Sequence, residues 1–375
     1  MHICFVALNS YNLFTSSTSM THIGGAEMQQ FLMARWLLEN GHQVTVVTRD
    51  HGQAQEESVD GIRIVKAYDV DKGLPIVRFL FPRWKRLLDA LRIADADIYY
   101  QRGAGVETGQ VALWCRSAAR AFVYASASDS DCNASLPFLS KVRDKVLYRK
   151  GLQLASAIVV QSQHQAALLE SAFGRSGTVI YSSGRRLGDP VPQSEKQNKV
   201  IWLGRFSPQK RFEWVLDIAA ASKNYEFLIL GASNDGSPYA RTMMERSESL
   251  PNVTLVGHVP KSDVAGFYNQ ARFLILTSPL EGFPNVFLEA WQLGVPVITT
   301  FDPDGIVEAN RLGWRIDSVE DACALLEKYE TDSTGLEELS ARVGKYFKEN
   351  HTADRNMPLY LELFQELVSE KSTTS

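Results

Sequence analysis

The stretch SPLEGFPNVFLEAWQLGVPVITT, from Ser278 to Thr300, follows one short apolar run of the kind that forms a buried strand and ends in a second. The first run, FLILT, ends at Thr277, and the second, PVITT, ends the stretch itself. Between them, Pro284 suits the first position of a helix, and Gly294 is a natural stop. The stretch therefore predicts a strand, a helix and a second strand parallel to the first.

The same alternation of apolar runs and amphipathic helical patterns continues along almost the whole chain. The expected strands are Ile3–Leu8, Val44–Thr48, Ile62–Ala67, Asp97–Gln101, Phe122–Ser126 and Ala157–Ser162 in the first half, and Val200–Gly204, Phe227–Gly231, Val253–Gly257, Phe273–Thr277 and Pro296–Thr300 in the second. Apolar runs joined by helices are typical of a parallel sheet that is covered on both faces. We therefore expect an α/β protein with two doubly wound, Rossmann-like domains.

A polar segment rich in Gly and Pro, Ser182–Lys199, separates the two series of strands. It has neither helical nor strand periodicity and is interpreted as a linker. The expected domains are 1–185 and 190–352, and an amphipathic helix at about 355–375 follows the last strand signal.

Composition limits the possible function. The chain has 375 residues, 45% hydrophobic residues and a net charge of -4, which suits two packed domains. Residues 1–190 hold 21 Lys and Arg against 17 Asp and Glu, an excess too small to indicate a nucleic-acid-binding surface. The four cysteines are scattered, which favours neither a zinc site nor a disulfide framework. No signal peptide or spanning helix is indicated, so we expect a cytoplasmic protein.

Two strand-to-helix turns carry groups that are suited to binding anions. In the first domain, Gly24 and Gly25 precede a helix, where glycines let free backbone N–H groups approach an anion closely. In the second domain, Gly204 ends a strand, and Arg205 and Lys210 follow it, so that two cations could neutralise a diphosphate without a metal. Each motif alone could instead be an ordinary helix start or a solvated basic loop.

The opening stretch adds two carboxylates at a strand end of the second domain. Glu289, in the first turns of the helix, could chelate vicinal hydroxyls such as those of a ribose. Glu281, in the preceding loop, lies where a second sugar could sit, and the backbone N–H groups near Asn285 and Val286 could bind phosphate. The two acids could equally be a helix-start carboxylate and part of a solvated helix face.

These motifs resemble those of a known enzyme family. The segments GGAE…GHQVTVVT, GRFSPQKRFEWVL, PNVTLVGHVP and EGFPNVFLEAWQLGVPVI are similar to successive motifs of the family four retaining glycosyltransferases, also described as glycosyl transferases group 1. The resemblance covers most of the chain. It implies the GT-B fold, with an acceptor-side N-terminal domain, a donor-binding C-terminal domain facing it across a cleft, and a C-terminal helix that crosses back to the N-terminal domain.

The resemblance also implies a role for each motif. Arg205 and Lys210 would contact the diphosphate of the donor, Glu289 the ribose and Glu281 the transferred sugar. Arg205, Lys210 and Glu281 are therefore the expected catalytic residues. The other donor-binding residues that it implies are Gly24, Gly25, Gly204, Gly282, Phe283, Pro284, Asn285 and Val286.

The chain departs from the family pattern after FVYAS, where many members have a His and this sequence has SASDSDCN. Asp129 or Asp131 could take a polar role beside the acceptor or the transferred sugar, and His22 is a further candidate contact. The two aspartates could instead hold a divalent metal that bridges a diphosphate. Because the cations that follow Gly204 can serve the diphosphate, we expect no metal site and no cofactor.

A basic, aromatic stretch, LPIVRFLFPRWKRLLDAL at residues 74–91, allows two interpretations. It could lie on an anionic membrane surface, as a lipid-linked acceptor would favour. It could equally be a helix that packs on its own domain with solvated charges.

The expected activity is metal-independent, retaining transfer of a sugar, of the hexosyltransferase type, from a UDP-, GDP- or ADP-sugar to a hydroxyl of a glycan or lipid-linked acceptor. Assembly of a cell-surface polysaccharide or glycolipid is the expected setting. Two alternatives stay open at this point: another enzyme on the same fold, such as a nucleotide-sugar epimerase or a phosphorylase, and a non-catalytic nucleotide-sugar-binding protein.

Overall fold

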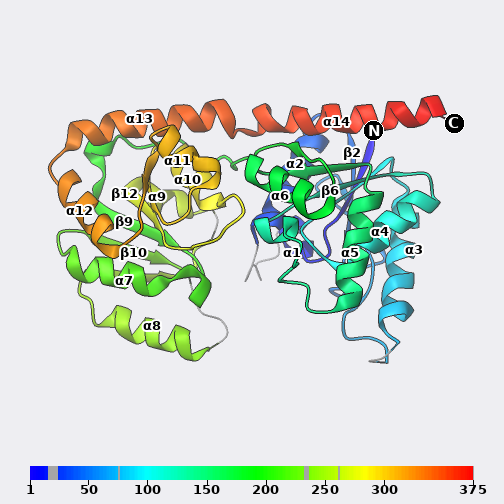
Figure 1. The fold of residues 1–375 in the computed structure, drawn as a ribbon, viewed down its shortest axis with the longest axis horizontal. Helices are drawn as coiled ribbons and strands as arrows, with labels where there is room; N and C mark the ends of the chain where they lie inside the picture. Colours follow the sequence, from blue (N-terminus) through cyan, green and yellow to red (C-terminus); the bar gives the residue numbers. More distant parts are fainter. Residues whose placement is uncertain (16–23, 75–76, 232–235, 261, 375) are drawn as a thin grey trace. The chain divides into compact units, whose positions relative to one another are not determined.

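The computed structural model describes residues 1–15, 24–74, 77–231, 236–260 and 262–374, which divide into two compact units. Unit 1 consists of Met1–Ser183 and Ala353–Ser375, and unit 2 of Gly184–Thr352 (Figure 1). Each unit is built around one largely parallel sheet. The predicted α/β class, with two Rossmann-like sheets, is confirmed.

The sheet of unit 1 has the strand order β3-β4-β2-β1-β5-β6-β7-β8. Its strands are β1 (His2–Val6), β2 (Gln43–Thr48), β3 (Glu56–Val59), β4 (Ile62–Lys66), β5 (Ile98–Arg102), β6 (Ala121–Ala125), β7 (Ala157–Val160) and β8 (Thr178–Val179). Neighbouring strands are parallel except β3 and β4, which pair antiparallel. The chain order reverses between β1 and β5, and in open α/β sheets ligands bind at such a point, beyond the carboxyl ends of the strands.

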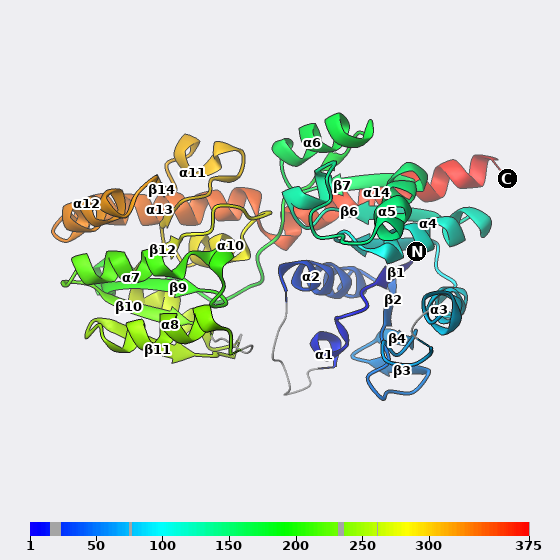
Figure 2. The same cartoon turned by 60° about the horizontal axis from the view of Figure 1, so that its bottom comes forward.

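Helices cover both faces of this sheet (Figure 2). Cys4 and Val6 of β1 face one apolar cluster, and Ile3 and Phe5 face the other, as the alternation of a strand requires. The first cluster is completed by α3 (Lys85–Ala94), α4 (Val106–Ser117), α5 (Val142–Leu154) and α6 (Gln163–Phe173), and the second by α2 (Gly25–Glu39) and α14 (Ala353–Thr374).

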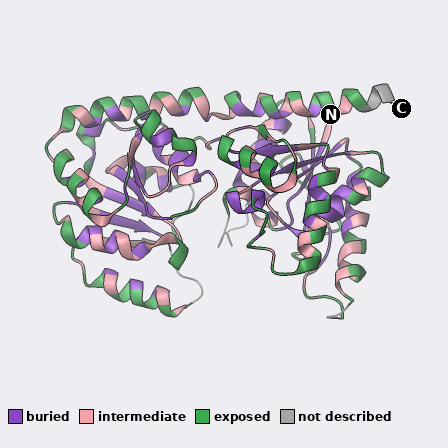
Figure 3. Cartoon of the chain, viewed as in Figure 1, coloured by how far each residue is buried: buried purple, intermediate pink, exposed green. Residues whose placement is uncertain are grey.

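The C-terminal helix α14 is part of the core of unit 1. The rings of Tyr360 and Phe364 lie 6.1 and 6.3 Å from the ring of Tyr100, measured between centroids. All three side chains are buried. Figure 3 colours the buried residues of the chain purple. The return of the final helix to the first domain, which the resemblance implied, is thereby confirmed.

The sheet of unit 2 has the strand order β11-β10-β9-β12-β13-β14, with all neighbours parallel. Its strands are β9 (Gln197–Leu203), β10 (Glu226–Leu230), β11 (Val253–Gly257), β12 (Ala271–Leu276), β13 (Val297–Thr299) and β14 (Gly313–Arg315). Its α-helices are α7 (Phe212–Ala221), α8 (Pro238–Glu248), α9 (Val264–Gln270), α10 (Asn285–Gln292), α11 (Ile306–Ala309), α12 (Val319–Tyr329) and α13 (Ser333–Asn350). The chain order reverses between β9 and β12, so the loops that follow these two strands lie side by side at a switch point.

Three strands were not predicted, and each has a physical reason. β3 has the sequence EESV and is an exposed antiparallel edge, so that it lacks the apolar run of a buried parallel strand. β8 and β14 lie at the sheet edges and are only two and three residues long. Short edge strands carry little periodicity for sequence analysis to detect.

The described residues contain no helix that is both long enough and apolar enough to span a membrane.

Candidate functional site

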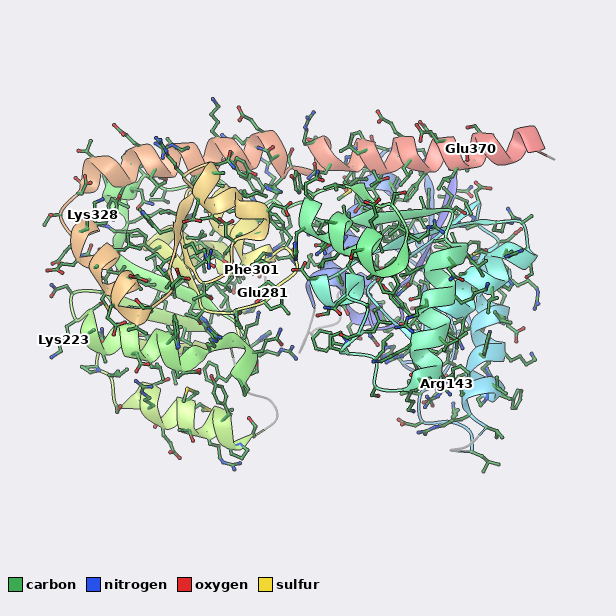
Figure 4. All side chains as sticks on the ribbon, in the orientation of Figure 1. Arg143, Lys223, Glu281, Phe301, Lys328 and Glu370 are labelled. Atoms are coloured by element: carbon green, nitrogen blue, oxygen red, sulfur yellow. The ribbon has the colours of Figure 1, made fainter. Side chains whose placement is uncertain are left out.

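Lys210 and Glu281 form an ion pair where the loops after β9 and β12 meet. Lys210 ends the short turn η4 (Pro208–Lys210), and its Nζ donates to Oε1 of Glu281, which Figure 4 labels. The two side chains are 23% and 17% exposed. The hydroxyl of Thr277 also donates to the main-chain carbonyl of Lys210 at 2.6 Å. The family motifs imply that the two residues contact different parts of a donor, and the structure shows that they are direct partners.

Glu289 on α10 is held by two residues that sequence analysis missed. The hydroxyl of Tyr268, on α9, donates to Oε2 of Glu289 at 3.2 Å, and Nε of Arg185 lies 3.8 Å from Oε1. Burial, followed by the nearby charge of Glu289, raises the pKa of Tyr268, so that its hydroxyl stays a neutral donor. A carboxylate can accept about four hydrogen bonds, so partners within the chain and a bound diol are compatible on one side chain.

The missed pair lacked a usable signal in the sequence. Arg185 falls in the segment interpreted as a linker, and Tyr268 falls in an apolar helical pattern, where an aromatic residue usually indicates core.

Gly204 is required by close packing at the end of β9. A Cβ at this position would lie 2.9 Å from the ring of Trp202, and the carbonyl oxygen of Gly204 would lie 1.8 Å from a Cβ at Gly231, where φ is +154°. The next residue, Arg205, is exposed. Among the residues that the structure describes, none forms an ion pair or a hydrogen bond with the guanidinium of Arg205.

The ring of Phe283 belongs to the core of unit 2. It is 6% exposed and lies 6.1 Å from the ring of Trp291 and 5.0 Å from that of His351, between centroids. Any contact that Phe283 or the neighbouring Gly282 makes with a donor would therefore come from their backbone atoms.

The helix α10 starts one residue later than the sequence predicted. Pro284 is the N-cap, with an extended ψ of 116°, and Asn285 is the first helical residue. The N–H of Phe287 donates to the carbonyl of Pro284 at 3.0 Å. The backbone N–H groups of Asn285 and Val286 thus lie in the first turn, where the helix dipole favours an anion.

A cavity of about 340 Å³ lies at the carboxyl ends of β12 and β13. Its lining residues are Pro279, Thr300, Phe301, Asp302, Gly305, Glu308 and Arg315. The carboxylate of Asp302 accepts hydrogen bonds from the backbone N–H groups of Val307 at 2.8 Å and of Glu308 at 3.1 Å. Burial raises the pKa of this carboxyl. From the sequence, Asp302 is interpreted as part of a turn that opens a helix, without a role in binding. Figure 4 labels Phe301, one of the residues that line this cavity.

Gly24 and Gly25 stand at the N-terminus of α2, as predicted from the sequence. Gly24 is the N-cap, and a Cβ there would lie 2.3 Å from Oε2 of Glu27. A carboxylate of the chain itself thus lies against this helix N-terminus, where the dipole favours negative charge. His22, the other candidate in this loop, lies outside the described residues.

Asp129 and Asp131 have different partners. Oδ2 of Asp131 accepts hydrogen bonds from the backbone N–H groups of Ala127 at 2.7 Å and Ser128 at 3.3 Å. These bonds cap the N-terminus of the turn η2 (Asp129–Cys132). Asp129 accepts from Nε2 of Gln165 at 3.0 Å. The described residues contain no group of three or more His, Cys, Asp or Glu side chains placed to hold a metal ion.

Both halves of the chain match models of glycosyltransferase families. Residues 24–181 match a glycosyl transferase 4-like domain, and residues 197–330 match glycosyl transferases group 1. The two matches do not overlap and together cover most of the chain. The chain therefore contains a glycosyl transferase 4-like domain followed by a glycosyl transferases group 1 domain.

Individual relatives are similar to parts of the chain. The amylovoran biosynthesis glycosyltransferase AmsD of Erwinia amylovora is 28% identical over 174 residues, 43% of this chain and 47% of its own length. The capsular polysaccharide biosynthesis glycosyltransferase CapM of Staphylococcus aureus is 38% identical over 137 residues, 34% of this chain and 36% of its own length. The matched part of this chain thus spans less than half the length of either relative.

The fold is similar to solved GT-B glycosyltransferase structures over its whole length. The structure of Anabaena HepE in complex with UDP and glucose has a TM-score of 0.75 and 17% sequence identity, covering 97% of this chain and 99% of that chain.

Proposed function

We propose that the chain is a glycosyltransferase that moves a sugar from a nucleoside-diphosphate sugar to a hydroxyl acceptor, and that unit 2 holds the donor. The observation that carries this proposal is the grouping of an ion pair and a second, separately held carboxylate at one switch point. Glu281 is paired with Lys210, whereas Glu289 is held by Tyr268 and Arg185.

Each group fits one part of such a donor. The carboxylate of Glu289 suits the vicinal hydroxyls of the ribose, and the first turn of α10 suits a phosphate. Lys210 has two N–H donors beyond the one it gives to Glu281, and these suit the diphosphate. Glu281 accepts through Oε1 and keeps Oε2 for a hydroxyl of the transferred sugar.

The groups also fit the chemistry of transfer. As the bond between sugar and diphosphate breaks, negative charge develops on the leaving oxygens, and cationic donors that are already in place stabilise that charge without reorganisation. Arg205 and Lys210 supply such donors on unit 2. We propose that transfer needs no metal ion and retains the anomeric configuration, in line with the family motifs.

The named relatives support a donor and a setting. HepE was solved with UDP and glucose, and CapM is named for capsular polysaccharide biosynthesis. We propose a UDP-sugar as the first donor to examine and a glycan or lipid-linked glycan of the cell surface as the acceptor class.

The direct test incubates the protein with UDP-, GDP- and ADP-sugars, with and without a mixture of glycan and lipid-linked acceptors. A transferase forms free nucleoside diphosphate and a glycosylated product only when an acceptor is present, and NMR of that product reads the anomeric configuration. Conversion of the sugar without an acceptor would indicate an epimerase instead. Binding of a donor with no turnover in any mixture would indicate a non-catalytic binder.

Metal independence has its own test. The transfer rate should be unchanged in excess EDTA. Loss of activity in EDTA and its recovery with Mg²⁺ or Mn²⁺ would contradict that part of the proposal and direct attention to Asp129 and Asp131.

A further inference from the structure

Exposed apolar side chains are concentrated in two segments of unit 1. Among the residues whose burial the structure describes, eleven large apolar side chains are exposed, and seven of them lie at positions 74–81 and 138–146. These seven are Leu74, Val77, Leu80, Phe81, Phe138, Val142 and Val146, with exposed fractions between 50% and 78%. Single exposed apolar residues are ordinary, but such a concentration marks an interaction surface.

The two segments are neighbours in space. The guanidinium of Arg143, in the first turn of α5, lies 3.5 Å from the centroid of the Phe79 ring, in the irregular turn η1 (Phe79–Trp84) that leads into α3. Figure 4 labels Arg143 on α5, and Figure 3 shows exposed residues on both α3 and α5. The cation–π contact therefore joins the apolar side chains of both segments into one surface, called the basic apolar surface below.

The two stretches of sequence that carry this surface have a net charge opposite to that of the rest of the chain. Residues 74–92 and 134–150 together hold ten Lys and Arg against two Asp. All other residues hold 29 Lys and Arg against 41 Asp and Glu. Both acids inside the segments are already paired, Asp89 with Lys85 at 2.7 Å and Asp144 with Arg143 at 2.8 Å. Arg86, Lys141 and Lys150 are exposed, and none of the described residues is recorded as their ion-pair partner.

We infer that the basic apolar surface docks on the headgroups of an anionic phospholipid bilayer. Exposed cations are attracted to anionic headgroups. Burial of exposed Phe, Leu and Val side chains at the boundary between headgroups and acyl chains lowers the free energy of the bound state. The two contributions occur together here, on adjacent segments. A purely electrostatic partner such as nucleic acid would leave the apolar side chains unused. A second copy of the same surface would bring two sets of cations together.

The inference extends the sequence-based hypothesis for residues 74–91 in one respect. It adds the loop before α5 and the first turns of that helix, which contribute Phe138, Val142 and Val146 and half of the cations. It does not depend on the proposed transfer activity, because vesicle binding is measured without donor or acceptor.

The test is flotation of the full chain with vesicles of phosphatidylcholine alone and of phosphatidylcholine with about 30% phosphatidylglycerol. The wild type should bind only the anionic vesicles, and binding should weaken as salt is raised. The triple variant Arg86→Glu, Lys141→Glu, Lys150→Glu should raise the lipid concentration for half-binding by at least about 100-fold, given the contribution expected of each cation. Phe81→Ser with Phe138→Ser should raise it by at least about tenfold.

Matched controls come from unit 2. Lys223→Glu with Lys328→Glu, and Met244→Ser, change exposed residues outside the surface and should leave vesicle binding unchanged. Unchanged melting temperatures would show that the variants are folded. Equal binding of wild type and both surface variants would overturn the inference, and so would no binding to anionic vesicles. Self-association that the Phe81 and Phe138 substitutions abolish, in a chain that binds no vesicles, would instead assign the surface to a second copy.

Discussion

Lys210 and Glu281 lie 71 residues apart in the sequence and form an ion pair in which each side chain is at least three-quarters buried. The pair joins the loop after β9 to the loop after β12. A Lys that is paired before a ligand arrives keeps its position, and its remaining donors need little reorganisation when a phosphate binds. Removal of either partner would leave the other charge mostly buried and unpaired.

Lys210→Ala should therefore lower the transfer rate by on the order of 100-fold or more, because it removes a cation from the leaving diphosphate. The measurement is kcat with saturating donor, together with the melting temperature to show that the variant is folded.

Lys223→Ala is the matched control, because Lys223 is exposed and lies in the loop before β10, at the amino end of the sheet (Figure 4). It should keep the wild-type rate. A Lys210→Ala variant with near-normal kcat would remove Lys210 from the mechanism.

Tyr268→Phe should weaken binding of nucleoside diphosphate by about 3- to 10-fold, because Glu289 loses the hydrogen bond from the Tyr268 hydroxyl while the ring still fills its place. Isothermal titration calorimetry measures this affinity. Tyr225→Phe is the control: its hydroxyl donates to the carbonyl of Leu326 at 3.0 Å, and its loss should leave nucleotide affinity unchanged. Equal affinities in wild type and Tyr268→Phe would show that this contact does not support Glu289.

Lys196 predicts a particular dependence of stability on pH. Its side chain is buried, with Nζ donating to the carbonyl of Leu293 at 3.0 Å, and burial lowers its pKa from 10.5 to about 7. Between these two values the unfolded chain binds a proton that the folded chain does not. The free energy of unfolding should therefore rise with pH through this window, by up to about 1.4 kcal/mol per pH unit from this one group.

The comparison is with Lys196→Met, which lacks the titrating group. The difference in unfolding free energy, wild type minus variant, should increase between pH 7 and pH 9 and should be nearly constant below pH 6. Urea unfolding at several pH values measures it. A difference that does not change with pH would contradict the lowered pKa.

The sheets could be predicted from the sequence because parallel strands buried on both faces are continuous apolar runs. β9 and β12 are of this kind, and a switch point between them follows from the order of strands and helices. The edge strand β3 could not be predicted, because its residues, EESV, pack on only one side and have no apolar run.

The partners of the candidate residues could not be predicted for a different reason. Gly204, Arg205 and Lys210 were recognisable because they directly follow a strand, where position alone indicates a site. The contact of Glu289 with Arg185 joins residues about a hundred positions apart, and no local pattern encodes such a contact. Phe283 shows the opposite case. It lies within a recognisable motif, but its ring packs against Trp291 and His351 in the core of unit 2.

The central proposal is that two carboxylates hold two different parts of one donor, the ribose at Glu289 and the transferred sugar at Glu281. Free nucleoside diphosphate contains the ribose and lacks the sugar, so it distinguishes the two roles. Both residues should be changed to Gln, which keeps the shape of the side chain and removes its charge.

Calorimetry of both variants, with nucleoside diphosphate and with the intact nucleotide sugar, is the most direct test. Glu289→Gln should weaken nucleoside diphosphate binding by about 1 to 3 kcal/mol. Glu281→Gln should leave that binding nearly intact, because the amide oxygen of Gln can still accept a hydrogen bond from Lys210, and should lose affinity only for the intact donor. Equal losses of nucleoside diphosphate affinity in both variants, or no loss in either, would contradict the proposed division between Glu289 and Glu281.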